Sequence, residues 1–206
     1  LFFYAIAHLP LATAITLNYT SPLFLAVFTP FLLHEKPKKS LFAGLIIGFI
    51  GVTLLLKPSF NSADLLAGSI GLLSGIGAAF AYIHVKQLGK ANEPDWRTVF
   101  YFTFISTIGA GLWMLFDSFN TIEWQDLPVL LGLGFSATIA QLAMTRAYRT
   151  GNTLVVASLA YVTVVLASLF GVLWWNEHLS LDAWVAIALI ILSGVISVRT
   201  TQTSNS

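Results

Sequence analysis

The chain of 206 residues is 57% hydrophobic and only 9% charged, and its formal net charge is +1. A soluble domain carries roughly 25% charged residues, so this composition excludes an ordinary water-soluble fold. The chain has no cysteine, which excludes disulfides, thiolate metal sites and thiol nucleophiles. These properties predict an all-α bundle of transmembrane helices, because a helix satisfies its own backbone hydrogen bonds inside lipid.

Seven stretches of the chain contain no Asp, Glu, Lys or Arg, and each is about as long as the ~20 apolar residues that cross a bilayer. The first stretch is too long for one span, and Pro10 favours a break within it. Residues 1–7 are therefore interpreted as the end of a helix that starts upstream, in a missing amino-terminal part. Complete spans are predicted at residues 11–33, 40–57, 66–86, 97–117, 127–147, 152–175 and 181–199.

Basic residues gather on one side of the predicted bundle, and short loops rich in Lys and Arg stay in the cytoplasm. When successive spans alternate in direction, only Lys57 of the ten basic residues falls on the opposite face. That face instead holds Asp64, Asp117, Glu123, Asp126, Glu177 and Asp182. We therefore predict a multi-pass protein of the cytoplasmic (inner) membrane, embedded in the lipid bilayer, with a cytoplasmic carboxyl terminus. The basic residues act as topology signals, and no nucleic-acid partner is expected.

An internal repeat relates the two ends of the chain. A shift of 142 residues superposes Ala5 on Ala147, Tyr19 on Tyr161, Phe28 on Phe170 and Glu35 on Glu177. In both copies a long span ends in a short polar cluster with Glu, and a shorter span with glycine follows. The charge distribution makes the first copy enter from outside and the second from the cytoplasm. Inverted copies of this kind are typical of secondary transporters.

Two segments resemble the EamA-type members of the drug/metabolite transporter superfamily. They are TAITLNYTSPLFLAVFTPFLLHEKPKKSLFAGLIIGFIGVTLLLKP (residues 13–58), with Ala14 eight positions before Pro22, and LASLFGVLWWNEHLSLDAWVAIALIILSGVISV (residues 166–198). The resemblance covers essentially all of the chain. It implies a ten-helix transporter made of two inverted five-helix repeats, from which the first two to three helices are missing here.

The same resemblance implies boundaries within the chain. Residues 1–58 would be the carboxyl-terminal part of the first repeat, 59–65 a periplasmic linker, 66–199 the second repeat and 200–206 a cytoplasmic tail. One position departs from the family pattern, because Val164 stands where the second repeat would match Pro22. The sequence therefore does not predict a matching kink in the two halves.

Two pairs of glycines at four-residue spacing lie inside predicted spans. Gly44 and Gly48 form one pair, and Gly71 and Gly75 form the other. The segment around the second pair looks like a nucleotide-binding loop only superficially, since no strand precedes it. Small residues at this spacing let helix backbones approach closely in membranes, so both pairs predict close helix contacts.

The span at 11–33 is the most polar, and it carries the first half of the predicted substrate site. Thr16, Asn18, Tyr19 and Pro22 lie near its centre. Pro22 cannot donate a hydrogen bond to the carbonyl of Asn18, which leaves that oxygen for a neighbour, water or substrate. Interrupted helices near the bilayer midplane bind substrates in many transporters. Alternatively, these polar side chains bond their own backbone or hold helices together.

The second half of the predicted site lies beyond residue 140. Tyr161 is near the middle of its span, as Tyr19 is, and Ser158 lies on the same helical face. A pair of aromatic rings across the repeat axis could sandwich a substrate, although ordinary packing is the alternative. Gln141 and Thr145 belong to a polar stripe that must face protein or water, because an unsatisfied amide in hydrocarbon costs several kcal/mol.

These features predict a permease that moves a small organic metabolite or amphipathic drug by alternating access. A non-transporting membrane subunit and a channel remain alternatives, and an intramembrane enzyme is least favoured because the spans hold no HExxH motif and no mid-span acid. We expect no catalytic residue, cofactor or metal. Neutral or zwitterionic substrates suit the predicted lining best. Homodimerisation is left open.

Overall fold

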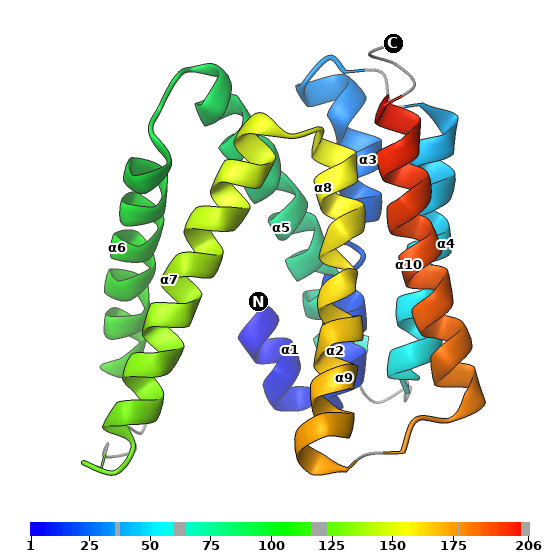
Figure 1. Cartoon of the computed structure of the whole chain (residues 1–206). Coiled ribbons are helices and arrows are strands. Elements are labelled where there is room, and N and C mark those ends of the chain that lie inside the picture. The colour runs from blue at the N-terminus through cyan, green and yellow to red at the C-terminus, as the bar shows by residue number, and fades with distance from the viewer. Residues whose placement is uncertain (36–37, 60–64, 117–122, 177, 203–206) are drawn as a thin grey trace. The chain divides into compact units, whose positions relative to one another are not determined.

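The structure is a computed structural model that describes residues 1–35, 38–59, 65–116, 123–176 and 178–202. Glu177, Asp64 and Asp117, which enter the sequence predictions, lie outside the described residues, as do 60–64 of the predicted linker and 203–206 of the tail. All regular elements of the described part are helices, which confirms the all-α transmembrane prediction. They are α1 (Phe2–His8), α2 (Leu11–Asn18), α3 (Ser21–Leu32), α4 (Lys39–Leu56), α5 (Leu65–Lys90), α6 (Asp95–Met114), α7 (Leu127–Thr150), α8 (Thr153–Ala160), α9 (Val162–Trp175) and α10 (Leu181–Gln202) (Figure 1).

Six of the seven predicted spans coincide with described segments that are long and apolar enough to cross a membrane. They are Leu11–Leu32, Lys39–Leu56, Leu65–Lys90, Leu127–Thr150, Thr153–Trp174 and Leu181–Thr200. The remaining prediction, 97–117, corresponds to α6, a helix of 20 residues. Its length of about 30 Å matches a bilayer. However, α6 is not among the six, since Arg97 and several hydroxyl residues make it less apolar.

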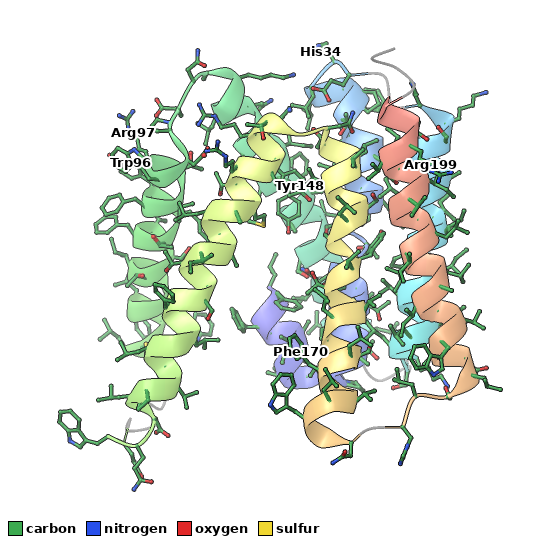
Figure 2. The ribbon with its side chains drawn as sticks, viewed as in Figure 1. His34, Trp96, Arg97, Tyr148, Phe170 and Arg199 are labelled. Carbon is green, nitrogen blue, oxygen red and sulfur yellow. The ribbon has the colours of Figure 1, made fainter. Side chains whose placement is uncertain are left out.

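Contacts divide the chain into two compact units. The first unit is Leu1–His84 with Asn152–Ser206, and the second unit is Val85–Gly151. In the first unit α4 and α10 lie side by side and run in opposite directions (Figure 1). Figure 2 shows His34 and Arg199 toward one end of the first unit and Phe170 toward the opposite end. In the second unit α6 packs against α7.

Charged groups tie together the helix ends of the second unit. The guanidinium of Arg149 donates to the Asp95 carboxylate at 2.9 Å, and Arg146 lies 3.8 Å from the same carboxylate. The ammonium of Lys86 donates to the carbonyl of Gly151 at 2.7 Å. That contact neutralises the negative end of the α7 helix dipole. These bonds join α5, α6 and α7 at the end where the sequence places its basic residues.

The helix boundaries repeat with the shift of 142 residues found in the sequence. Adding 142 to the bounds of α2, residues 11–18, gives 153–160, which are the bounds of α8. The same addition carries the start of α4, residue 39, onto the start of α10, residue 181. Within the first unit, α2 and α3 together run opposite to α8 and α9 (Figure 1). The local structure therefore has the internal repeat, with inverted direction.

The two spans that the repeat relates, Leu11–Leu32 and Thr153–Trp174, are each interrupted at a tyrosine. The first interruption is at Tyr19 and Thr20, where the Thr20 N–H donates to the Leu17 carbonyl at 3.2 Å. The second is at Tyr161, whose N–H donates to the Ser158 carbonyl at 3.3 Å. Both are bonds to the third preceding residue, which tighten a helix into a 3₁₀ turn.

The second interruption corrects the sequence analysis, which did not predict matching kinks because Val164 replaces proline. At the first interruption Pro22, in the first turn of α3, has no N–H to donate to the Asn18 carbonyl, which opens the helix between these two residues. The second interruption, at Tyr161, forms without a proline.

The predicted glycine contacts are confirmed. A Cβ added at Gly71 would lie 2.8 Å from Leu17 Cδ1, and one at Gly75 would lie 2.9 Å from the Leu17 carbonyl oxygen. A Cβ at Gly44 would lie 2.9 Å from Ser197 Oγ, and one at Gly48 would lie 2.6 Å from Tyr161 Cδ2. Glycine is therefore required where α5 meets α2, and where α4 meets α10 and Tyr161.

Candidate functional site

The centre of the candidate site is the tyrosine pair, Tyr19 and Tyr161. Their ring centroids are 6.0 Å apart and the ring planes are inclined by 54°. Tyr161 is fully buried, whereas Tyr19 is half-buried. This spacing is that of two aromatic rings in direct contact. The rings lie together as the repeat suggests, but a planar substrate could enter between them only by separating them.

The two phenol groups of the tyrosine pair have different surroundings. The Tyr19 hydroxyl lies near the Thr163 hydroxyl. The Tyr161 hydroxyl is buried and has no hydrogen-bond partner among the described residues. Burying a hydroxyl without a hydrogen-bond partner costs about 1–3 kcal/mol of folding free energy, so water or a ligand that pairs with this group would stabilise the protein.

The ring of Tyr161 rests on the α4–α10 pair. Its Cδ2 atom would lie 2.6 Å from a Cβ added at Gly48, and Ser193 Oγ would lie 2.5 Å from the same Cβ. Sequence reasoning missed Ser193 and Thr163. The shift of 142 places Thr163 opposite Ser21, so a pair of hydroxyl residues could have been noticed. Nothing in the sequence pairs Ser193 with Gly48, because that contact joins distant helices.

Thr16 and Asn18 of the predicted site have structural partners. The Thr16 hydroxyl donates to the Ala12 carbonyl at 2.8 Å, within its own helix. The Asn18 amide donates to Ser74 Oγ at 3.1 Å, and Ser74 donates on to the Gly71 carbonyl at 2.6 Å. These bonds match the alternative in which polar residues hold helices together. Asn18 nevertheless lies directly before Tyr19, so the bond from Asn18 to Ser74 still helps to position the Tyr19 ring.

Pro22 and the Asn18 carbonyl lie against protein. Pro22 is buried, and the Asn18 carbonyl oxygen would lie 3.3 Å from a Cβ added at Gly75. The oxygen that proline leaves unpaired therefore faces α5. The sequence analysis expected it to serve a neighbour, water or substrate, and the structure favours the neighbour.

Ser158, three residues before Tyr161, and two threonines elsewhere in the same two spans bury their hydroxyls. Ser158 is fully buried and donates to the Val155 carbonyl at 2.9 Å. Thr29 on α3 and Thr153 on α8 are also buried, and their hydroxyls have no hydrogen-bond partner in the part of the chain that the structure describes. α3 packs against α8. Sequence reasoning did not assign these two threonines to the site.

Gln141 and Thr145 belong to α7 in the second unit and are described separately from the tyrosine pair. Thr145 is 4% exposed and Gln141 is partly exposed. Thr138, on the same stripe, is exposed and donates to the Gly134 carbonyl at 2.8 Å. The stripe is thus buried at the Thr145 end of α7 and exposed at the Thr138 end.

The tyrosine pair and its neighbours offer hydroxyl and aromatic groups without formal charge. Residues 11–32 and 153–174, which carry the pair, contain no Asp, Glu, Lys or Arg. Among the residues that the structure covers, no three His, Asp or Glu side chains are grouped to hold a metal ion. Such a surface can bind uncharged or zwitterionic molecules by hydrogen bonds and ring contacts.

Comparisons with known proteins match the chain almost from end to end. The sequence model of the EamA-like transporter family matches residues 1–57 and 65–199. The pseudopaline exporter CntI of Pseudomonas aeruginosa is 32% identical over 197 residues, which are 96% of this chain and 66% of that protein. The riboflavin transporter of Vibrio cholerae is 28% identical, over 94% of this chain and 64% of that protein.

An uncharacterized transporter of Helicobacter pylori is 30% identical, over 95% of this chain and 67% of that protein. A protein of known crystal structure superposes with a TM-score of 0.82 at 20% identity, over 96% of this chain and 71% of the other. That likeness concerns the fold. The chain thus spans about two thirds of the length of the curated relatives that it matches.

Proposed function

Because the chain belongs to the EamA-like transporter family, we propose that the protein is a permease that moves a small organic molecule across the cytoplasmic membrane by alternating access. The observation that carries this proposal is the pair of matching helix interruptions. Each interrupts a membrane span, each carries a tyrosine, and the two tyrosine rings meet at 6.0 Å. Interrupted helices in inverted repeats are where secondary transporters bind their cargo.

We propose Tyr19, Tyr161 and Ser158 as the core of the substrate site, with Thr16, Asn18 and Pro22 positioning the first ring. Support comes from the buried hydroxyl of Tyr161, which finds no hydrogen-bond partner in the part of the chain that the structure describes. A substrate oxygen or nitrogen that accepts from this hydroxyl would relieve its desolvation cost. Gln141 and Thr145, on α7 of the second unit, are proposed separately as polar substrate contacts.

The cargo that suits these groups is uncharged or zwitterionic and carries hydrogen-bonding groups. The spans that hold the tyrosine pair have no ionisable acid or base to neutralise a strong ion. The names of two relatives, a pseudopaline exporter and a riboflavin transporter, support an organic cargo and differ in what it is. We therefore propose the class of cargo and leave its identity to a metabolite panel.

The test measures transport by the full-length protein in vesicles and compares alanine variants. We expect Tyr19→Ala, Asn18→Ala and Tyr161→Ala each to reduce transport while membrane insertion stays intact. Tyr101→Ala is the matched control, because Tyr101 is 55% exposed on α6 and is not one of the proposed site residues. Unchanged transport in all three variants would discard the site assignment. Transport that neither saturates nor shows counterflow would indicate a channel.

We propose that the end of the bundle with Lys38 and the carboxyl terminus lies in the cytoplasm. The Lys38 ammonium donates to the Thr200 carbonyl at 3.0 Å, so both groups occupy one end of the first unit. Short basic loops remain cytoplasmic. Single cysteines at Lys39 and Ser180 test this proposal in a chain that has no native cysteine. Membrane-impermeant maleimide added outside should label the variant at Ser180 and spare the variant at Lys39; the reverse labelling would invert the topology.

A further inference from the structure

We infer that α4 and α10 form a fixed joint, a helix pair that keeps one geometry while the rest of the transporter changes conformation. The inference rests on the proposed transport function. Alternating access requires that some contacts between inverted repeats open, and that others persist as the pivot. The chemistry of the α4–α10 contact distinguishes it from the contact between α3 and α8.

Glycines bring the two helix backbones of the joint together. Gly44, Gly48 and Gly51 follow one another at four- and three-residue spacing, so they share one face of α4. An added Cβ at Gly51 would lie 2.9 Å from the carbonyl oxygen of Ala186 and 2.8 Å from Ile190 Cγ1. Contact with a backbone atom cannot be relieved by a rotamer change. The two helix backbones therefore lie in close contact along this face.

Hydrogen bonds cross the joint. In its buried middle, the Ser193 hydroxyl donates to the Gly44 carbonyl at 2.7 Å. Separating the helices would leave this serine hydroxyl unpaired in an apolar medium, which is costly in lipid. At one end Lys38 donates to the Thr200 carbonyl at 3.0 Å, and at the other Lys57 lies 3.5 Å from Asp182. The Ser193–Gly44 bond therefore holds the buried middle of the joint, and the exposed contacts at its two ends add little.

The contact between α3 and α8 differs from the joint. Both helices bury threonine hydroxyls, at Thr29 and Thr153, that have no hydrogen-bond partner among the described residues. Admitting water to these hydroxyls would satisfy them, so opening this contact regains hydrogen bonds. Opening the joint would lose one. The same conformational change therefore favours separation of α3 from α8 and persistence of α4 with α10.

The joint also supports the substrate site. The Tyr161 ring lies against Gly48 in the middle of the joint, next to Ser193. Because α4 and α10 stay together, the Tyr161 ring keeps its position while the Tyr19 ring, on the other repeat, moves toward it or away from it. The two rings can then separate to admit a planar substrate while Tyr161 keeps its contacts in the joint.

Cross-linking tests the joint directly, because the chain contains no cysteine of its own. The first variant combines Gly44→Cys with Ser197→Cys. A Cβ at position 44 lies 2.9 Å from Ser197 Oγ, where the sulfur of the second cysteine would be, so the two residues can form a disulfide. The Ser197→Cys substitution also removes the serine oxygen that the new cysteine side chain at position 44 would otherwise contact. Each single-cysteine variant serves as the matched control.

We expect the oxidised double variant of the full-length protein to transport within about twofold of its reduced form. A second variant, Lys57→Cys with Asp182→Cys, places both cysteines at exposed positions and is linked by a short bis-thiol reagent, so it tests the joint without altering packing. Retained transport in a linked protein supports the joint. Loss of transport on linking, with recovery on reduction of the disulfide, overturns the joint and leaves the transport proposal standing. Absence of transport in the parent protein without the introduced cysteines refutes the proposed function instead.

Discussion

Replacing Gly51 by alanine should destabilise the protein, because the new methyl group has no space. It would lie 2.9 Å from a carbonyl oxygen and 3.2 Å from the backbone nitrogen of Ile190 on α10. Overpacking of this kind costs about 1–3 kcal/mol. Gly77→Ala is the matched control, since no atom lies within 4 Å of a Cβ added at that helical position.

The comparison of the two variants isolates the clash. Alanine improves the helix propensity of either site by about 1 kcal/mol, and this common gain cancels in the difference. For a chain of this size, 1 kcal/mol corresponds to about 2–4 °C in Tm, so Gly51→Ala should melt about 2–12 °C below Gly77→Ala. The assay is thermal unfolding of the purified protein in detergent, followed by intrinsic fluorescence. Equal melting temperatures for the two variants would refute the close approach of α4 and α10.

Two further outcomes follow from the described contacts. Tyr161→Phe removes a buried hydroxyl that has no partner among the described residues, so the Tm of the protein should stay equal or rise. The variant also loses a substrate hydrogen bond of about 1 kcal/mol, so its apparent KM should rise roughly fivefold. A lower Tm with an unchanged KM would show that the hydroxyl has a structural role instead. Arg149→Ala removes the 2.9 Å bond to a carboxylate that is 17% exposed, and should cost about 1.5–3 kcal/mol. Arg97→Ala breaks a more exposed pair and should cost about 0.5 kcal/mol or less, so similar melting temperatures for both variants would contradict the tie between α6 and α7.

The repeat shows how far local sequence information extends. The shift of 142 residues was visible from a few identities, and it also relates the bounds of α2 to those of α8. The interruption at Tyr161 was not predicted, because proline is the only strong local signal for a break and Val164 stands at the equivalent position. A 3₁₀ turn without proline depends on tertiary packing, which the local sequence does not contain.

The candidate site shows the same division. Residue types and depth identified Tyr19, Tyr161 and Asn18 as polar groups inside spans. They did not reveal that Asn18 bonds to Ser74, or that the Tyr161 ring rests on Gly48. Both contacts join residues far apart in the chain, so no periodicity within one helix predicts them.

The sequence by itself determined that the chain is an all-α membrane protein and where most spans lie, because a bilayer constrains the length and charge of every crossing segment. Only the tertiary structure decided which helix faces meet, such as the α4–α10 joint, and which buried hydroxyls lack partners among the described residues. The physical reason is that lipid and protein interior are both apolar. A membrane helix therefore carries little sequence contrast between its buried and its lipid-facing sides.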